Sequence, residues 1–295
     1  MSDSTYDPVA GVTWGVVSGG QNVRAAVVLE AEHEVIHNGN DFTGGGAPPA
    51  GGTAPIPVGS SPPFGPTNGL AFDGIVPSSG GSSNTNVGPN RAKIVVAGWF
   101  KPGASLDTGL TYTILSNDDG TGIVANLSYD AGWFLTVTIV NAGFDAETQW
   151  AIPVGDLSAW HHFAVSSDLG ASPGAGPTTR TSAMYDGVAV NPAGIVDLGT
   201  GTAHFGQIMW IGQSAGASPF KGCLAQIAFS RDAYYDMTNP TTQAIFYNAG
   251  PVDTASLAAI LFYVLDGDTA AAFFTNQGLS LVTFTAPTDH TSACG

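Results

Sequence analysis

Charged residues are scarce in this sequence. Lys, Arg, Asp and Glu make up 10% of the 295 residues, with 7 positive charges against 23 negative ones and a formal net charge of −16. A nucleic-acid-binding protein neutralises phosphates with clustered Lys and Arg. The composition therefore excludes nucleic acid as a partner, and it argues in the same way against binding to an anionic membrane.

Long apolar runs are also missing. No stretch approaches the roughly 18 residues that a membrane-spanning helix needs. The densest run, Ala255 to Leu265, is shorter and contains Ser256. The first residues carry Asp3 and Asp7 and are followed by no apolar signal core. We therefore expect synthesis in the cytoplasm without export, and no membrane insertion.

Cysteine residues are scarce as well. The two cysteines, Cys223 and Cys294, are too few to build a disulfide framework. Cys223 stands in an apolar run, so we expect it to pack as a small apolar side chain. Cys294 is expected to lie in a loose tail. The sequence leaves the redox state of both open.

Glycine and proline, by contrast, are abundant, and they stand between short apolar runs, which predicts many turns. Over Trp133 to Val140 three apolar residues alternate with threonines, a period of two that predicts a strand with one wetter face. Ile94 to Phe100 is apolar on both faces, as a central strand covered on both sides would be. Asp186-Gly187 predicts a two-residue hairpin turn.

One late helix follows the predicted strands. Asn239-Pro240 is typical of an N-cap followed by a first helical proline, so we expect a helix from Pro240 to about Asn248. It would bury Ile245 and stop at Gly250. Many short strands, the turns between them and this helix predict an all-β, antiparallel two-sheet sandwich with one short C-terminal helix.

The composition divides the chain into three parts. Residues 1–67 are predicted to be an irregular N-terminal arm with short strands, including Val12 to Val17 and Ala25 to Glu30, and a Gly/Pro-rich linker over Gly44 to Pro66. Residues 68–250 hold the sandwich, in which Ser78 to Pro89 is predicted to be a polar loop. Residues 251–295 are predicted to be a C-terminal strand extension and tail.

Five short segments of the central part occur in the order found in laminin-G-like, concanavalin-A-like lectin domains, which the chain resembles. They are Leu70–Gly74, Ala97–Pro102 with Thr113–Ser116, Trp160–Val165, Met184–Gly187, and Trp210–Gly212 continuing to Phe220–Leu224. The resemblance implies a jelly roll of two curved antiparallel sheets. The family often has acidic residues where this chain has Ala225 and Gln226, so we expect the N-terminal arm or a partner to cover that face.

The C-terminal part resembles versions of this domain in tailed-phage virion proteins. There the helix is followed by an apolar strand and an Asn-x-Gly turn, here Ile260 to Leu265 and Asn276-Gln277-Gly278, with Leu279 to Thr285 as a last edge strand. This implies a non-enzymatic virion structural protein, as a capsid decoration, tail or fibre component. Its partners would be other virion subunits, contacted through the N-terminal arm and C-terminal extension, in a homo-oligomer or larger assembly. The alternative is a carbohydrate-binding lectin or adhesin module for host-surface glycans.

Candidate catalytic residues are hard to find. A glycosidase needs two carboxylates facing one another, as in a strand that reads Glu-x-Asp-x-x-Glu, and the sequence has no such strand. Glu30, Glu32 and Glu34 alternate, but they lie outside the sandwich. We interpret them as a solvated strand face. His161 and His162 are adjacent on a predicted strand, so their side chains point to opposite faces and cannot share one ion. We expect a scaffold role for the pair and predict no catalytic residue.

Two ligand sites remain open. Asp118 and Asp119, in a loop with Asn117 and Gly120, could supply oxygen ligands to calcium, which relatives often hold at the sandwich rim; the same residues are also typical of a plain turn. Trp133 could stack on a sugar ring, with Asn117 as a second ligand-binding residue. The competing interpretation, for Trp133 as for Trp14 and Trp150, is a buried core side chain.

Overall fold

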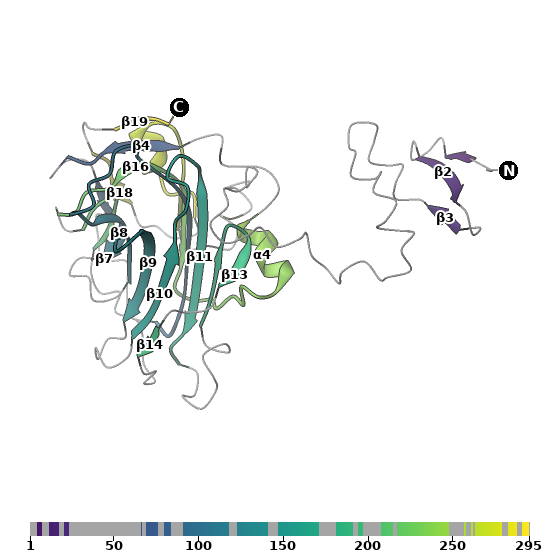
Figure 1. Cartoon of the computed structure of the whole chain (residues 1–295), viewed down its shortest axis with the longest axis horizontal. Helices are drawn as coiled ribbons and strands as arrows, with labels where there is room; N and C mark the ends of the chain where they lie inside the picture. Colours follow the sequence, from purple (N-terminus) through teal and green to yellow (C-terminus); the bar gives the residue numbers. More distant parts are fainter. Residues whose placement is uncertain are drawn as a thin grey trace. The chain divides into compact units, whose positions relative to one another are not determined.

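The computed structural model describes residues 5–7, 12–17, 21–23, 66, 69–75, 80–83, 91–117, 123–140, 147–170, 181–190, 194–196, 208–214, 217–247, 257, 261, 263–278, 283–287 and 291–294. The chain forms two compact units, Met1–Thr53 and Ala54–Gly295 (Figure 1). The first contains an antiparallel sheet of β1 (Thr5–Asp7), β2 (Val12–Val17) and β3 (Gln21–Val23). The strand predicted over residues 25–30 lies outside the described residues.

The second unit is the predicted sandwich of two antiparallel sheets. The first sheet runs in the order β14 (Gly194–Val196), β10 (Glu147–Pro153), β9 (Trp133–Val140), β8 (Ile123–Tyr129), β7 (Tyr112–Asn117), β15 (Met209–Ile211), β5 (Gly81–Ser83) and β18 (Phe284–Thr285). The second sheet runs in the order β13 (Val188–Val190), β12 (Thr181–Tyr185), β11 (His161–Asp168), β6 (Lys93–Pro102), β16 (Lys221–Ser230), β4 (Leu70–Asp73) and β19 (Thr291–Ala293), with β17 (Tyr263–Leu265) on β16. The predicted all-β fold class is confirmed.

The alternation of side chains explains the core between the sheets. On β9, Leu135, Val137 and Ile139 are fully buried, whereas the intervening Thr136 and Thr138 are half-buried. Because successive side chains of a strand point to opposite faces, the apolar row faces the other sheet and the threonines face outward. The predicted wetter face is therefore confirmed.

A second, smaller core lies on the outer face of the second sheet. It explains why β6 is apolar on both faces: Ile94 and Val96 belong to the core between the sheets, whereas Val95 and Ala97 belong to the outer one. The outer core is closed by residues that follow β16 in the chain, namely Met237, Phe246, Leu257, Leu261 and Val264.

The predicted helix is α4 (Pro240–Phe246), and Asn239 caps it by accepting a 2.9 Å hydrogen bond from the Thr241 amide. The helix ends earlier than predicted because Tyr247 adopts an extended conformation. It buries Phe246 rather than Ile245, which is half-buried. A second short helix, α6 (Ala270–Phe273), was not predicted. No helix in the described part of the chain is long and apolar enough to span a membrane.

The described part of the C-terminal segment is built into both sheets. Strand β17 pairs with β16, β18 pairs with β5, and β19 pairs with β4. The polar loop predicted over residues 78–89 is wrong at Gly81–Ser83, which form β5 between β15 and β18. The lack of a side chain at Gly81 permits this pairing, because a Cβ there would collide with the Phe274 ring.

The prediction for the two cysteines is also wrong. Cys223 on β16 and Cys294 form a disulfide across a sequence separation of 71 residues. Cys294 is not in a loose tail: its amide donates a 3.0 Å hydrogen bond to the Gly69 carbonyl, directly after β19. The pairing of β19 with β4 brings the two thiols together, and the sequence gives no sign of that pairing.

The strand around Ala225 and Gln226 is contacted by the chain's own C-terminal segment. A bulge interrupts β16 between Ala225 and Ala228, and Gln226 adopts a positive φ of 49° there. The Gln226 amide donates a 3.3 Å hydrogen bond to the Asp266 carboxylate, which directly follows β17. The Asp266 carboxylate thus contacts this segment from within the sandwich, and cover by the N-terminal arm or a partner stays a prediction.

Candidate functional site

The hairpin between β12 and β13 positions the main polar network of the sandwich. Asp186 and Gly187 both adopt left-handed conformations, with φ of 47° and 79°, as a two-residue hairpin turn requires. The Asp186 amide donates a 2.9 Å hydrogen bond to the His162 carbonyl of the neighbouring strand. The predicted turn is therefore confirmed, and it places the Asp186 carboxylate beside β11.

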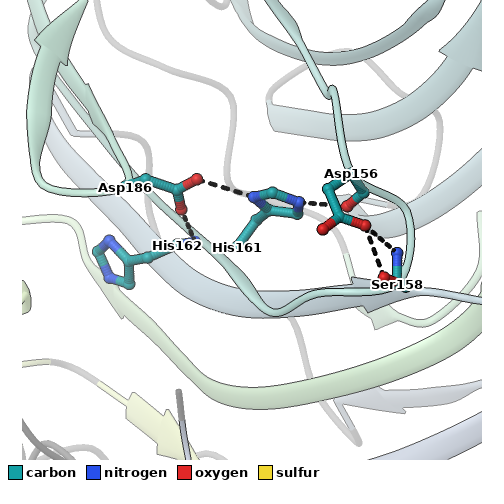
Figure 2. A network of polar contacts seen from close by, with 5 residues as sticks. All are labelled: Asp156, Ser158, His161, His162 and Asp186. Carbon is teal, nitrogen blue, oxygen red and sulfur yellow. Dashed lines mark hydrogen bonds and ion pairs between the residues drawn. The ribbon is translucent and has the colours of Figure 1, made fainter. Parts of the chain in front are cut away.

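His161 lies between this carboxylate and the loop that precedes β11. Its Nδ1 is 2.8 Å from one Asp186 oxygen, and its Nε2 is 2.6 Å from the Asp156 carbonyl oxygen (Figure 2). The second Asp186 oxygen accepts the His162 amide at 2.7 Å. Burial works to lower the pKa of His161, but the hydrogen bond to Asp186 and the charge of that carboxylate outweigh it and raise the pKa above 6.5.

His162 points to the opposite face of the strand, as the alternation predicts (Figure 2). Its ring lies 5.0 Å from the Trp99 ring and 5.4 Å from the Tyr247 ring, measured between centroids. The side chain is buried and its Nδ1 has no hydrogen-bond partner. Burial without a partner disfavours the charged form and lowers the pKa of His162 to about 3.

The His161–Asp186 pair has the composition of an acid–base dyad but no access to a substrate. Both side chains have an exposure of 0%. A general acid or base must come within hydrogen-bonding distance of the atom that gains or loses the proton. The pair instead ties β11, the β12–β13 turn and the loop at Asp156 together, which is the scaffold role expected for this strand.

Of the predicted ligand residues, the structure describes Asn117 and Trp133. Asn117 is fully buried, and its side-chain oxygen accepts a 3.0 Å hydrogen bond from the Ile123 amide across the β7–β8 connection. Its amide group is thus part of the turn and does not face solvent. Asp118 and Asp119, the predicted calcium ligands, lie outside the described residues, as do the side chains of Trp14 and of Glu30, Glu32 and Glu34. Within the part of the chain that the structure describes, no three His, Cys, Asp or Glu side chains cluster as a metal site would.

The tryptophans have different surroundings. Trp150 is fully buried in the core between the sheets. Trp133, at the start of β9, is half-buried, with its ring centroid 5.4 Å from that of Tyr129 and 6.1 Å from that of Tyr112. Only Trp133 among the predicted ligand residues therefore reaches the surface in the described part of the chain.

One exposed large apolar side chain, Tyr129, lies beside Trp133, and another, Leu110, stands in the loop that is bonded to Tyr112. Tyr129 faces Trp133 across the β8–β9 hairpin and is 44% exposed; Leu110, in the loop before β7, is 55% exposed. The same loop is held onto Tyr112 by a 2.7 Å hydrogen bond from the Asp107 amide to the tyrosine hydroxyl. We name Leu110, Tyr129 and Trp133 the rim patch. The sequence contains a signal for the rim patch that Trp133 alone does not provide: Tyr129 and Trp133 are aromatic residues on either side of the Asp130-Ala131-Gly132 turn.

Comparisons with known proteins bear on the fold. No family model and no curated protein matches the chain. Similar solved structures are a heptameric pentraxin from Limulus polyphemus (TM-score 0.45, 14% identity, 77% of this chain and 94% of that chain) and a putative carbohydrate-binding protein from Bacteroides ovatus (0.44, 16%, 75% and 60%). Tailspike protein 2 of an Escherichia coli bacteriophage is similar as well (0.41, 12%, 68% and 30%). With TM-scores below 0.5 and identities below 25%, these similarities carry no argument about function.

Proposed function

We propose that the chain is a non-enzymatic structural protein of a tailed-phage virion, in which a displayed jelly-roll module is attached through its N-terminal unit. The observation that carries the proposal is the division of the chain. Met1–Thr53 is a compact unit of its own with a separate sheet, and Ala54–Gly295 is a sandwich that includes the C-terminal segment. A self-contained module next to a second small unit suits display and attachment.

The order of elements after β16 supports the virion assignment. Helix α4 is followed by β17 and then by a turn in which the Asn276 side chain accepts hydrogen bonds from the Val264 amide at 3.2 Å and the Gly278 amide at 2.8 Å. This is the helix, strand and Asn-x-Gly order on which the resemblance to virion proteins depends. The turn closes onto β17, so the motif is a structural element of the sandwich.

The structure changes which segment we assign to attachment. Strands β17, β18 and β19 each pair with a strand of their own sandwich, so this segment is part of the displayed module. We therefore assign attachment to the other virion proteins to residues 1–53. The non-enzymatic part of the proposal is supported by the burial of the His161–Asp186 pair, which leaves this acid–base pair to a structural role.

Deleting the codons for residues 1–53 tests the attachment. In a phage that encodes this protein, we expect the shortened product to accumulate in the lysate but to be lost from density-purified particles, as measured by immunoblotting. Far-ultraviolet circular dichroism of the purified shortened chain controls for folding of the sandwich. Particles that incorporate a folded shortened chain at the full level would contradict the proposed role of the N-terminal unit.

A second candidate function, binding of host-surface glycans, is favoured by the rim patch. Exposed aromatic rings offer an apolar face with a polar edge, which suits the alternating apolar and hydroxyl surfaces of a sugar ring. The rings of Tyr129 and Trp133 meet at 69°, so they form a corner rather than a flat surface. The exposed Asp130 in the same hairpin turn supplies acceptor oxygens next to this corner.

Substitution of Trp133 by Ala is expected to weaken glycan binding by about tenfold, the order of magnitude for losing one aromatic contact. The measurement is titration calorimetry with a sugar first identified on a glycan array. Ile75→Ala is the matched control, because Ile75 is also an exposed apolar residue, at 48%, but stands in the loop after β4. Equal losses in both variants, or unchanged binding in Trp133→Ala, would remove the rim patch as the site.

A further inference from the structure

The last strand of the chain closes one edge of the second sheet with few contacts. Strand β19 has three residues and is the outermost strand, paired only with β4 in the described sheet. The register places Ser292 opposite Ala71, and the Cys294 amide bonds to the Gly69 carbonyl. An outermost strand of this length makes too few backbone hydrogen bonds to offset the entropy of ordering it. The covalent bond from Cys294 to Cys223 therefore holds it in place.

The strand beneath, β4, is a potential interface. It is paired with β16 on its other side, so removal of β19 would leave one edge of β4 with unpaired backbone groups. Such an edge readily accepts a strand from another chain. The segment whose backbone register on this edge is known is residues 291–294 themselves.

We propose that residues 291–294 are a redox-gated edge strand. The Cys223–Cys294 disulfide keeps them on β4, and its reduction opens this edge to the same strand of a second copy of the chain. The occupant follows from the pairing already present, because exchange between two copies recreates every β19–β4 hydrogen bond. Mutual exchange of an identical element is a low-cost way to form a dimer, and it suits the repeated assembly of the proposed function.

The gating reaction is ordinary thiol–disulfide exchange. A thiolate of a dithiol reductant attacks one sulfur of the bond and displaces the other cysteine as a thiolate; the second thiol of the reductant then releases the mixed disulfide. Two electrons and two protons end on Cys223 and Cys294, and the reductant becomes a cyclic disulfide. Both cysteines are half-buried rather than sealed in the core, so a small dithiol can reach them.

Hydrogen exchange on the full chain, before and after treatment with dithiothreitol, tests the gate. Hydrogen-bonded pairs alternate along antiparallel strands, so the Gly69–Cys294 bond makes Ala71 the next residue of β4 whose amide faces β19. We expect reduction to speed exchange at Ala71 by at least about a hundredfold, while Ala97 on central β6 is unchanged. If the Ala71 amide stays protected from exchange in the reduced chain, the disulfide does not control the opening of this edge and the proposal is contradicted.

Reoxidation at high protein concentration tests whether the strand of a second copy occupies the open edge of β4. We expect a covalent dimer in which mass spectrometry finds Cys223 peptides joined to Cys294 peptides. Cys223→Ser controls for random thiol oxidation, since its only dimer would join two copies of Cys294. Ser292→Pro removes the amide opposite Ala71 and is expected to abolish the Cys223–Cys294 dimer. An open edge without any such dimer overturns the second copy as occupant, and equal dimerisation of Ser292→Pro overturns strand exchange.

Discussion

Acidification from about pH 6.5 to about pH 3 is expected to remove up to about 5 kcal/mol of unfolding free energy through His162 alone. The pKa of this side chain falls from 6.5 in an exposed reference to about 3 in the fold. The unfolded chain therefore takes up a proton in this range and the folded chain does not. The stabilisation is fully present above pH 6.5 and is lost as the pH falls, because the buried ring has no partner for a second N–H.

His162→Phe is the variant that isolates this effect. Phenylalanine keeps an aromatic ring against Trp99 and Tyr247 and has no nitrogen to protonate. Urea unfolding at about pH 7 and about pH 4 should show the wild type losing about 3 kcal/mol more than the variant. The same loss in both proteins would mean that other groups, not His162, set the acid limit of the fold.

Removal of the Asp186 carboxylate is expected to cost about 3–5 kcal/mol, the usual penalty for breaking a buried ion pair from one side. In Asp186→Ala the His161 imidazole and the His162 amide both lose their acceptor in a fully buried site. Alanine is also strained at the φ of 47° that this turn position adopts. Urea unfolding at about pH 6, where His161 holds its proton, measures the loss.

Asp186→Asn is the matched control for the charge. Asparagine tolerates the left-handed turn and can still accept the His162 amide, so its loss of stability should be the smaller one. The raised pKa of His161 adds stability that is fully present below pH 6.5 and is lost as the pH rises through the folded value. Asp186→Asn should flatten this alkaline loss. Wild-type stability of Asp186→Asn at about pH 6, with only Asp186→Ala destabilised, would show that the turn geometry and an acceptor oxygen, not the ion pair, are what Asp186 provides.

Features that depend on a few neighbouring residues could be predicted from the sequence. The alternation over Trp133–Val140, the Asp186-Gly187 turn and the Asn239 cap each depend on a few adjacent side chains, and the structure has all three. Features that depend on register between distant strands could not. The Cys223–Cys294 bond depends on the pairing of β19 with β4. The place of Gly81–Ser83 in a sheet depends on the pairing of β18 with β5.

The candidate sites show the same limit. The scaffold role of His161 was predictable, but its partner Asp186 lies 25 residues away and is found only through the register of β11 with β12. Asn117 was chosen because its residue type suits ligands, and the same oxygen instead caps the β7–β8 connection. Trp133 was identified, whereas the exposure of Tyr129 beside it follows from their pairing across the hairpin.

Quantitative mass spectrometry of density-purified particles, from a phage whose genome carries this gene, tests the central claim most directly. If the chain is a displayed structural module, its peptides should be present in many copies per particle and should remain after washing with high salt. Abundance in the lysate together with absence from the particles would contradict a structural role in the virion.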